Sequence, residues 1–122
     1  MTTNAELHQR RTAAIPRGVA NSLAVYAERA TNAELWDVEG KRYVDFASGI
    51  AVLNTGHRHP TVVKAIAAQL EKLMHTCFQV TPYANYIELC EQLIKLAPGP
   101  TPKKSMLFST GAEGIENALK IA

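Results

Sequence analysis

The residues best suited to chemistry are Ser109-Thr110-Gly111-Ala112, where an apolar run meets a helix-like pattern. The first N–H groups of a helix have no partner within it, and with the helix dipole they favour an anion. Gly111 would let a phosphate approach the backbone closely, Ala112 is small enough not to obstruct it, and the two hydroxyls could donate. An ordinary turn between a strand and a helix is the alternative. The segment has neither the Gly-Lys-Ser/Thr of a P-loop nor a Gly-x-Gly-x-x-Gly motif.

Two histidines raise the question of a metal site. His57 and His59 flank Arg58, and in extended backbone their rings would share one face, as two metal ligands could. Because a third ligand is missing nearby, the sequence predicts no metal site. It favours histidines that anchor the loop before a helix.

The carboxylates near these histidines have no catalytic spacing. Asp37, Glu39 and Asp45 do not form a pair typical of a glycosidase, and we expect them to cap or stabilise turns. No Gly-x-Ser-x-Gly motif is present, so a serine nucleophile at a strand-to-helix elbow is excluded.

The elements that must position these residues differ between the two halves of the chain. Residues 24–47 predict an antiparallel meander, because turn signals at Thr31-Asn32 and Glu39-Gly40 separate three strand-like runs. The expected strands are 25–30, 34–38 and 42–47. Residues 48–60 form an apolar loop, and loops of this kind line pockets or interfaces.

The second half predicts the opening of an α/β layer domain. The expected elements are a helix from 60 to about 75, a helix from 81 to 97, a strand at 104–109 and a helix from 113 onward. We therefore expect residues 1–59 to form an N-terminal arm, a small sheet and the apolar loop. Residues 60–122 would begin a larger domain that continues beyond this chain, since the last helical pattern has no stop signal.

Composition sets the outer limits on function. The chain has 122 residues, 47% hydrophobic and 20% charged, with a net charge of +2. It is thus long enough for one domain with a core, and its composition is not that of a disordered chain. The sequence has neither the ~20-residue apolar run of a membrane span nor the apolar stretch of a secretory leader. Scattered basic residues argue against a nucleic-acid partner. Cys77 and Cys90 are expected to be buried thiols in a reducing cytosol.

Two segments together resemble a known family. Residues 36–60 (WDVEGKRYVDFASGIAVLNTGHRHP) and 109–122 (STGAEGIENALKIA) are similar in order and spacing to the N-terminal third of the class III pyridoxal-phosphate aminotransferases. The resemblance covers essentially the whole chain. It implies an α/β protein whose N-terminal three-stranded antiparallel meander precedes the first helices and strand of the cofactor-binding large domain. Further matches at 15–19 (IPRGV), 54–57 (NTGH) and 75–80 (HTCFQV) are most similar to bacterial members that act on 4-aminobutyrate.

The resemblance assigns roles to individual residues. It implies pyridoxal 5'-phosphate as the cofactor of the full-length protein, with Gly111 and Ala112 binding its phosphate, which outweighs the ordinary-turn alternative. It places Ile50 on the substrate side, against the methylene chain of an ω-amino acid, and Gln79 near the cofactor. Gly114 stands where the family usually has alanine, which costs the helix roughly 1 kcal/mol and loosens the phosphate-binding turn.

The implied activity is transfer of the amino group of 4-aminobutyrate, or of a similar ω-amino acid, to 2-oxoglutarate by a cytoplasmic homodimer. Acetylornithine or another ω-amino acid as the donor is an alternative. A stand-alone phosphate-binding or dimerisation module without catalysis is another. No catalytic residue is assigned, because the family's cofactor-linked lysine lies later in the chain and Lys120 is no candidate. We expect the 122 residues alone to be inactive, to bind neither nucleic acid nor membrane, and to self-associate.

Overall fold

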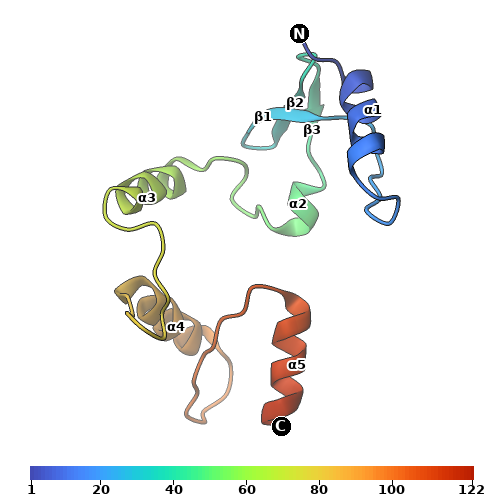
Figure 1. Ribbon diagram of the computed structural model, residues 1–122. Coiled ribbons are helices and arrows are strands. Elements are labelled where there is room, and N and C mark those ends of the chain that lie inside the picture. The colour runs from blue at the N-terminus through green and yellow to red at the C-terminus, as the bar shows by residue number, and fades with distance from the viewer. The chain divides into compact units, whose positions relative to one another are not determined.

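The computed structural model covers residues 1–122 and consists of two compact units, Met1–Lys72 and Leu73–Ala122 (Figure 1). The first unit contains helix α1 (Asn4–Ala14), the sheet, the short turn α2 (Ser48–Ala51) and helix α3 (Pro60–Leu70). The second contains helices α4 (Ala84–Leu96) and α5 (Gly111–Ile121).

The sheet of the first unit confirms the predicted meander. It consists of β1 (Ala27–Thr31), β2 (Glu34–Asp37) and β3 (Arg42–Val44), all antiparallel and in the order β1-β2-β3. The two connecting turns use residues that tolerate the left-handed region, Asn32 at φ 49° and Gly40 at φ 80°. Strands β2 and β3 end earlier than the sequence pattern predicts, by one and three residues, whereas β1 begins two residues later and ends one residue later than predicted.

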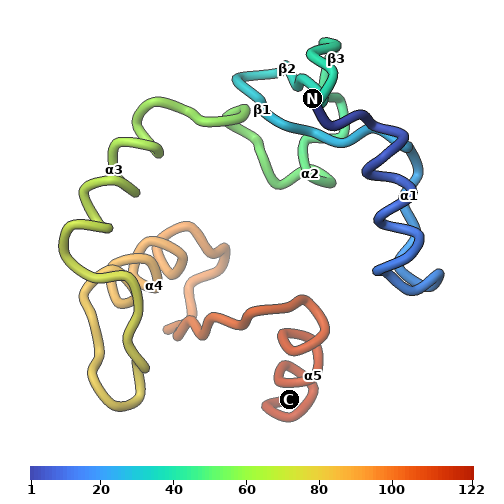
Figure 2. Tube along the Cα trace, turned by 45° about the horizontal axis from the view of Figure 1, so that its top comes forward, coloured from blue at the N-terminus to red at the C-terminus, as the bar shows by residue number.

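Helix α1 (Asn4–Ala14) is attached to this sheet by its first residue. Thr3 and Glu6 form a capping box that fixes the helix start. The side-chain amide of Asn4 donates to Asp37 Oδ2 over 2.9 Å, while its Oδ1 accepts from the N–H of Tyr26 over 2.8 Å. The start of α1 consequently lies beside the turn between β2 and β3 (Figure 2).

Asp37 is the buried centre of these contacts, with 1% of its surface exposed. Its carboxylate accepts hydrogen bonds from the Asn4 amide, the Tyr43 hydroxyl and the backbone N–H groups of Glu39 and Lys41, at 2.9 to 3.0 Å. Burial raises the pKa of Asp37, but these four hydrogen bonds outweigh it and hold the pKa below its ordinary value. The predicted turn role of Asp37 is confirmed.

Two short-range features complete the first unit. The turn α2 comprises Ser48–Ala51, and helix α3 comprises Pro60–Leu70 with proline in its first turn. Helix α3 ends before the predicted residue 75, because the Lys72 N–H bonds to the Gln69 carbonyl and tightens the chain into a turn.

The second unit differs from its sequence prediction at both helix starts. Helix α4 (Ala84–Leu96) begins three residues late, since Thr81 precedes a proline and Tyr83 is extended. Helix α5 (Gly111–Ile121) begins two residues early, at a capping box formed by Thr110 and Glu113.

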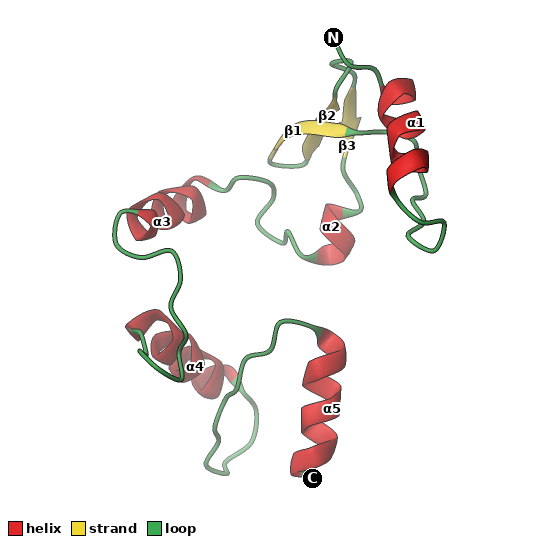
Figure 3. Ribbon diagram, in the orientation of Figure 1, coloured by secondary structure: helices red, strands yellow, loops and turns green.

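The predicted strand at 104–109 is not a strand in the structure, where the segment is a loop (Figure 3). No neighbouring strand pairs with it, and a strand is stabilised by such pairing. The N–H of Leu107 instead donates to the Tyr86 hydroxyl over 3.1 Å, which joins the segment to α4.

The expected hydrophobic core does not form. No hydrophobic residue is buried, and no helix packs extensively against another element. The apolar residues of the helices are exposed instead, among them Ile66, Leu70, Leu93, Leu96, Ile115 and Leu119. For the same reason the predicted burial of the cysteines is wrong: Cys77 is exposed and Cys90 is half-buried. None of the helices has the length and apolar character needed to cross a membrane.

Candidate functional site

The N-terminus of α5 places Gly111 and Ala112 at its first two positions. The Thr110 hydroxyl oxygen accepts from the Glu113 N–H over 3.1 Å, and the Thr110 carbonyl accepts from the Gly114 N–H over 3.1 Å. The N–H groups of Gly111 and Ala112 come before the first intrahelical bond and point out of the helix end. Two adjacent donors thus have no acceptor within the helix at the start of α5.

These residues fit a phosphate group such as that of pyridoxal phosphate. A Cβ atom added at Gly111 would have no atom within 4 Å, so the space in front of this backbone is open. The hydroxyl hydrogens of Ser109 and Thr110 supply further donors. The nearby carboxylate of Glu113 accepts from the Thr110 N–H over 3.0 Å. The donor set and the helix dipole together suit an anion.

Gln79 lies in a turn that aromatic contacts hold against α4. The Thr81 N–H donates to the Cys77 carbonyl over 2.8 Å, which closes the turn. Phe78 stacks on Tyr86 with ring centroids 4.2 Å apart. The Gln79 side chain is exposed. Phe78 lies in the loop and Tyr86 in α4, so no short sequence pattern predicts this stacking.

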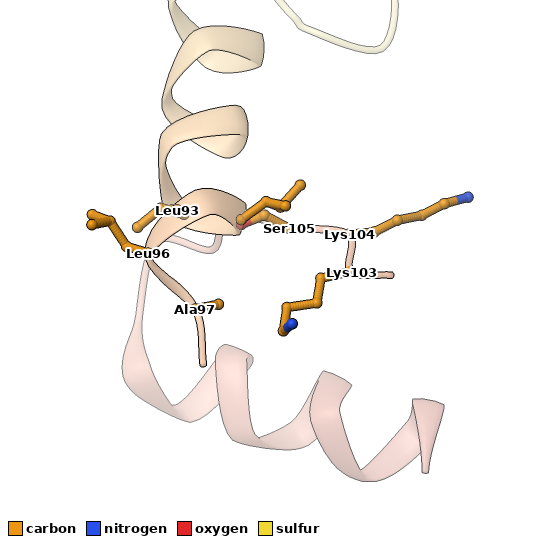
Figure 4. A pocket seen from close by; sticks show the side chains of 7 residues that line it. Leu93, Leu96, Ala97, Lys103, Lys104 and Ser105 are labelled. Carbon is orange, nitrogen blue, oxygen red and sulfur yellow. The ribbon is translucent and has the colours of Figure 1, made fainter. Parts of the chain in front are cut away.

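A cavity of about 500 Å³ lies where the C-terminal end of α4 faces residues 103–105 (Figure 4). Leu93, Leu96 and Ala97 line it from the helix side. The ammonium group of Lys103 donates to the Gly99 and Thr101 carbonyls. This lysine is therefore committed to its own loop, and none of the predicted site residues lines the cavity.

The turn α2 carries the predicted substrate residue Ile50 in an unusual conformation. Ser48, Gly49, Ile50 and Ala51 all have positive φ, between 45° and 65°. The Ser48 carbonyl accepts from the N–H groups of Val52 and Leu53 at 3.0 and 3.1 Å. We call Ser48–Ala51 the left-handed turn. The Ile50 side chain is 93% exposed.

Asp45 and His57 flank this turn and contact each other. His57 Nε2 lies 2.6 Å from Asp45 Oδ2, and because a carboxylate only accepts, Nε2 carries the hydrogen of this bond. The hydrogen bond from His57 is the largest cause of a pKa for Asp45 below its ordinary value, and the Ser48 N–H adds to it. The predicted anchoring role of His57 and turn role of Asp45 are confirmed. Their pairing was missed.

Lys120, which is no catalytic candidate, is paired with Glu116 over 2.8 Å on the exposed surface of α5. No three histidine, cysteine, aspartate or glutamate side chains come together in a way that could hold a metal ion.

Comparison with known proteins gives a consistent result. A family model described as aminotransferase class-III matches residues 14–122. The chain is 58% identical over 122 residues to 4-aminobutyrate aminotransferase GabT of Escherichia coli (strain K12), covering 100% of this chain and 29% of that protein. It is 58% identical over 120 residues to 5-aminovalerate aminotransferase DavT of Pseudomonas aeruginosa, covering 98% of this chain and 28% of that protein.

Among solved structures, acetylornithine aminotransferase from Elizabethkingia anophelis matches with a TM-score of 0.86 and 27% identity. The match covers 99% of this chain and 30% of that one. The chain thus spans less than a third of the length of the curated relatives that it matches.

Proposed function

Because the chain belongs to the class III aminotransferase family, we propose that it forms the N-terminal part of an enzyme that moves the terminal amino group of a short ω-amino acid to 2-oxoglutarate. The observation that carries this proposal is 58% identity, over essentially the whole chain, to relatives named for 4-aminobutyrate and 5-aminovalerate. These two amino donors differ by one methylene group. We propose 4-aminobutyrate as the first substrate to test.

Family membership implies pyridoxal phosphate as the cofactor, which when bound supplies the electron sink that amino-group transfer requires. In this chain the N–H groups of Gly111 and Ala112 would bind its phosphate, and the start of α5 would fix its orientation. Gln79 would contribute a polar group near the cofactor. The exposed Ile50 would contact the methylene chain of the donor.

The cofactor assignment is tested at Gly111 in the full-length protein. A valine there puts a branched side chain into the open space before the helix, so we expect cofactor retention after gel filtration to fall at least about tenfold. Gly114→Ala is the matched control, because a Cβ at Gly114 also meets no atom within 4 Å but lies beyond the first two N–H groups; alanine there favours the helix, so retention should stay the same or rise. Equal retention in both variants would remove Gly111 from the site.

The substrate assignment is tested by comparing amino donors with 2-oxoglutarate as the acceptor. We expect kcat/KM for 4-aminobutyrate or 5-aminovalerate to exceed that for acetylornithine by at least about tenfold, since a site built for one polar group rejects a donor that lacks or misplaces it. The reverse order would support an acetylornithine aminotransferase, the activity named for the structural relative.

For the oligomer and location we propose a cytoplasmic homodimer. The exposed apolar faces of the helices, such as that formed by Ile115 and Leu119, need further protein to cover them, which the rest of the longer chain or a second subunit would supply. The 122-residue chain alone is expected to self-associate and to be inactive, and a monomer in light scattering would contradict the first of these. Saturable binding of pyridoxal phosphate by an inactive chain would favour the binding-module alternative.

A further inference from the structure

We propose that Asp45 and His57 are a positioning pair, which holds the left-handed turn in shape and thereby sets where Ile50 meets the amino donor. The inference rests on the proposed function. It depends on the backbone conformation of Ser48–Ala51.

The left-handed turn is a strained conformation for this sequence. Only Gly49 of its four residues adopts positive φ without a steric penalty, while Ile50 at φ 59° is β-branched and pays the largest one. Such strain persists only where the surrounding structure imposes it. The two hydrogen bonds accepted by the Ser48 carbonyl come from Val52 and Leu53, directly after the turn, and so do not connect the turn to the sheet.

Asp45 supplies the contact at the start of the turn. Its Oδ1 accepts from the N–H groups of Ala47 and Ser48, at 3.0 and 2.9 Å, which fixes the direction in which the chain enters the turn. Its other oxygen, Oδ2, is then held by His57 Nε2 at 2.6 Å. One carboxylate therefore connects the entry of the turn to a residue beyond its exit.

The backbone of His57 is itself fixed to the sheet. Its N–H and carbonyl exchange hydrogen bonds with those of Asn32, at 2.8 and 2.9 Å, in the turn between β1 and β2. Gly56 passes so close to Asn32 that an added Cβ would lie 2.9 Å from Asn32 Oδ1 and 3.1 Å from its backbone. Both ends of residues 48–56 are thus attached to the same sheet.

Ile50 depends on this attachment for its position. Within residues 1–122 Ile50 is 93% exposed, so in this part of the chain the backbone of the turn decides where its side chain lies. Donors that differ by one methylene would be discriminated by the position of such an apolar contact. Loosening the pair should change discrimination between donors more than it changes turnover.

The experiment uses the full-length holoenzyme with His57→Phe, which keeps a ring but removes the hydrogen bond to Asp45. We expect the ratio of kcat/KM for 4-aminobutyrate to that for 5-aminovalerate to change at least about threefold, mainly through KM, with unchanged cofactor content. Hydrogen exchange of the amides in residues 46–57 should become at least about tenfold faster. Asp45→Asn, which retains an oxygen for the Ala47 and Ser48 N–H groups, should change the ratio in the same direction by less.

Glu34→Gln is the matched control, because it breaks an ion pair with Arg42 on the sheet surface and leaves the turn untouched. An unchanged donor ratio in both test variants, or a fall in kcat equal for both donors with KM unchanged, would overturn the inference. A ratio change of the same size in the control would overturn it too. A wild-type enzyme that uses neither donor would refute the proposed function and the inference together, whereas an unchanged ratio in an active enzyme refutes the inference alone.

Discussion

In Met1–Lys72, the carboxylates of Asp37 and Asp45 each collect donors from separate parts of the chain. In Leu73–Ala122, the contacts between segments come from the stack of Phe78 on Tyr86 and a bond from Leu107 to the Tyr86 hydroxyl. A hydrogen-bonded carboxylate is satisfied by the groups that touch it, whereas an apolar helix face is satisfied only when something covers it. The first unit can therefore keep its local geometry without a core. The second unit needs further protein to cover its apolar helix faces.

The largest effect expected from this difference follows from Asp37→Ala. Removing the acceptor of four hydrogen bonds leaves the Asn4 amide, the Tyr43 hydroxyl and two backbone N–H groups without a partner. We expect the amides of β2 and β3 to lose their protection against hydrogen exchange entirely. Protection in α4 should be unchanged, because none of the four donors to Asp37 belongs to it.

Glu116→Gln is the control for that prediction, since it removes a carboxylate whose partner Lys120 is exposed. It should leave exchange in both units unaffected. Retention of protection in the sheet of the Asp37→Ala variant would show that the polar contacts are not what holds the first unit.

The next largest effect concerns the close approach of Gly56 to Asn32. Alanine at Gly56 must adopt φ 79° and also push against the Asn32 backbone at 3.1 Å, so we expect a loss of about 3 kcal/mol in unfolding free energy. Gly40→Ala has a nearly identical φ of 80° with no atom within 4 Å, and should lose only about 1 kcal/mol. Urea unfolding, followed by the NMR signals of the sheet amides, measures the loss of unfolding free energy in both variants. Equal losses would mean that the positive φ, and not the contact with Asn32, sets the cost.

A smaller effect is expected in the second unit from Tyr86→Phe. The variant keeps the ring that stacks on Phe78 but removes the acceptor of the Leu107 N–H, which costs about 1 kcal/mol. Exchange of the Leu107 amide should accelerate roughly tenfold while the sheet amides stay as they are. An unchanged exchange rate of the Leu107 amide would show that the stack of Phe78 on Tyr86 does not need this hydrogen bond to hold the segment 104–109.

The smallest effect is an acid sensitivity confined to the first unit. Because the pKa of folded Asp37 is lowered from 3.8, its contribution to stability is fully present above that value and is lost as the pH falls through the lowered pKa. The pKa of Asp45 is lowered as well, so the left-handed turn should loosen over the same acidic range. An NMR titration of the sheet amides should show this loss of stability at acidic pH. If the loss is absent in the Asp37→Asn variant, protonation of Asp37 is its cause.

The sequence predicted well what depends on local chemistry. Asn and Gly in the turns indicated the meander, and Ser109–Ala112 indicated a turn into a helix, although the helix begins at Gly111 rather than at 113, because these preferences act within a few residues. It predicted poorly what depends on distant partners. The segment 104–109 has the pattern of a strand but no neighbour to pair with, and Cys77 has an apolar context but no core to enter. The hydrogen bond between Asp45 and His57 joins two residues that belong to no common short sequence motif.

The order β1-β2-β3 also has a consequence for folding. Each strand pairs with its neighbour in sequence, so both hairpins close loops of only a few residues, which is fast compared with any pairing across the chain. During synthesis the sheet can form as soon as β3 has left the ribosome. The bridge from Asn32 to His57 must wait for the loop that follows. The strained turn then adopts its conformation last, after the sheet to which it is attached has folded.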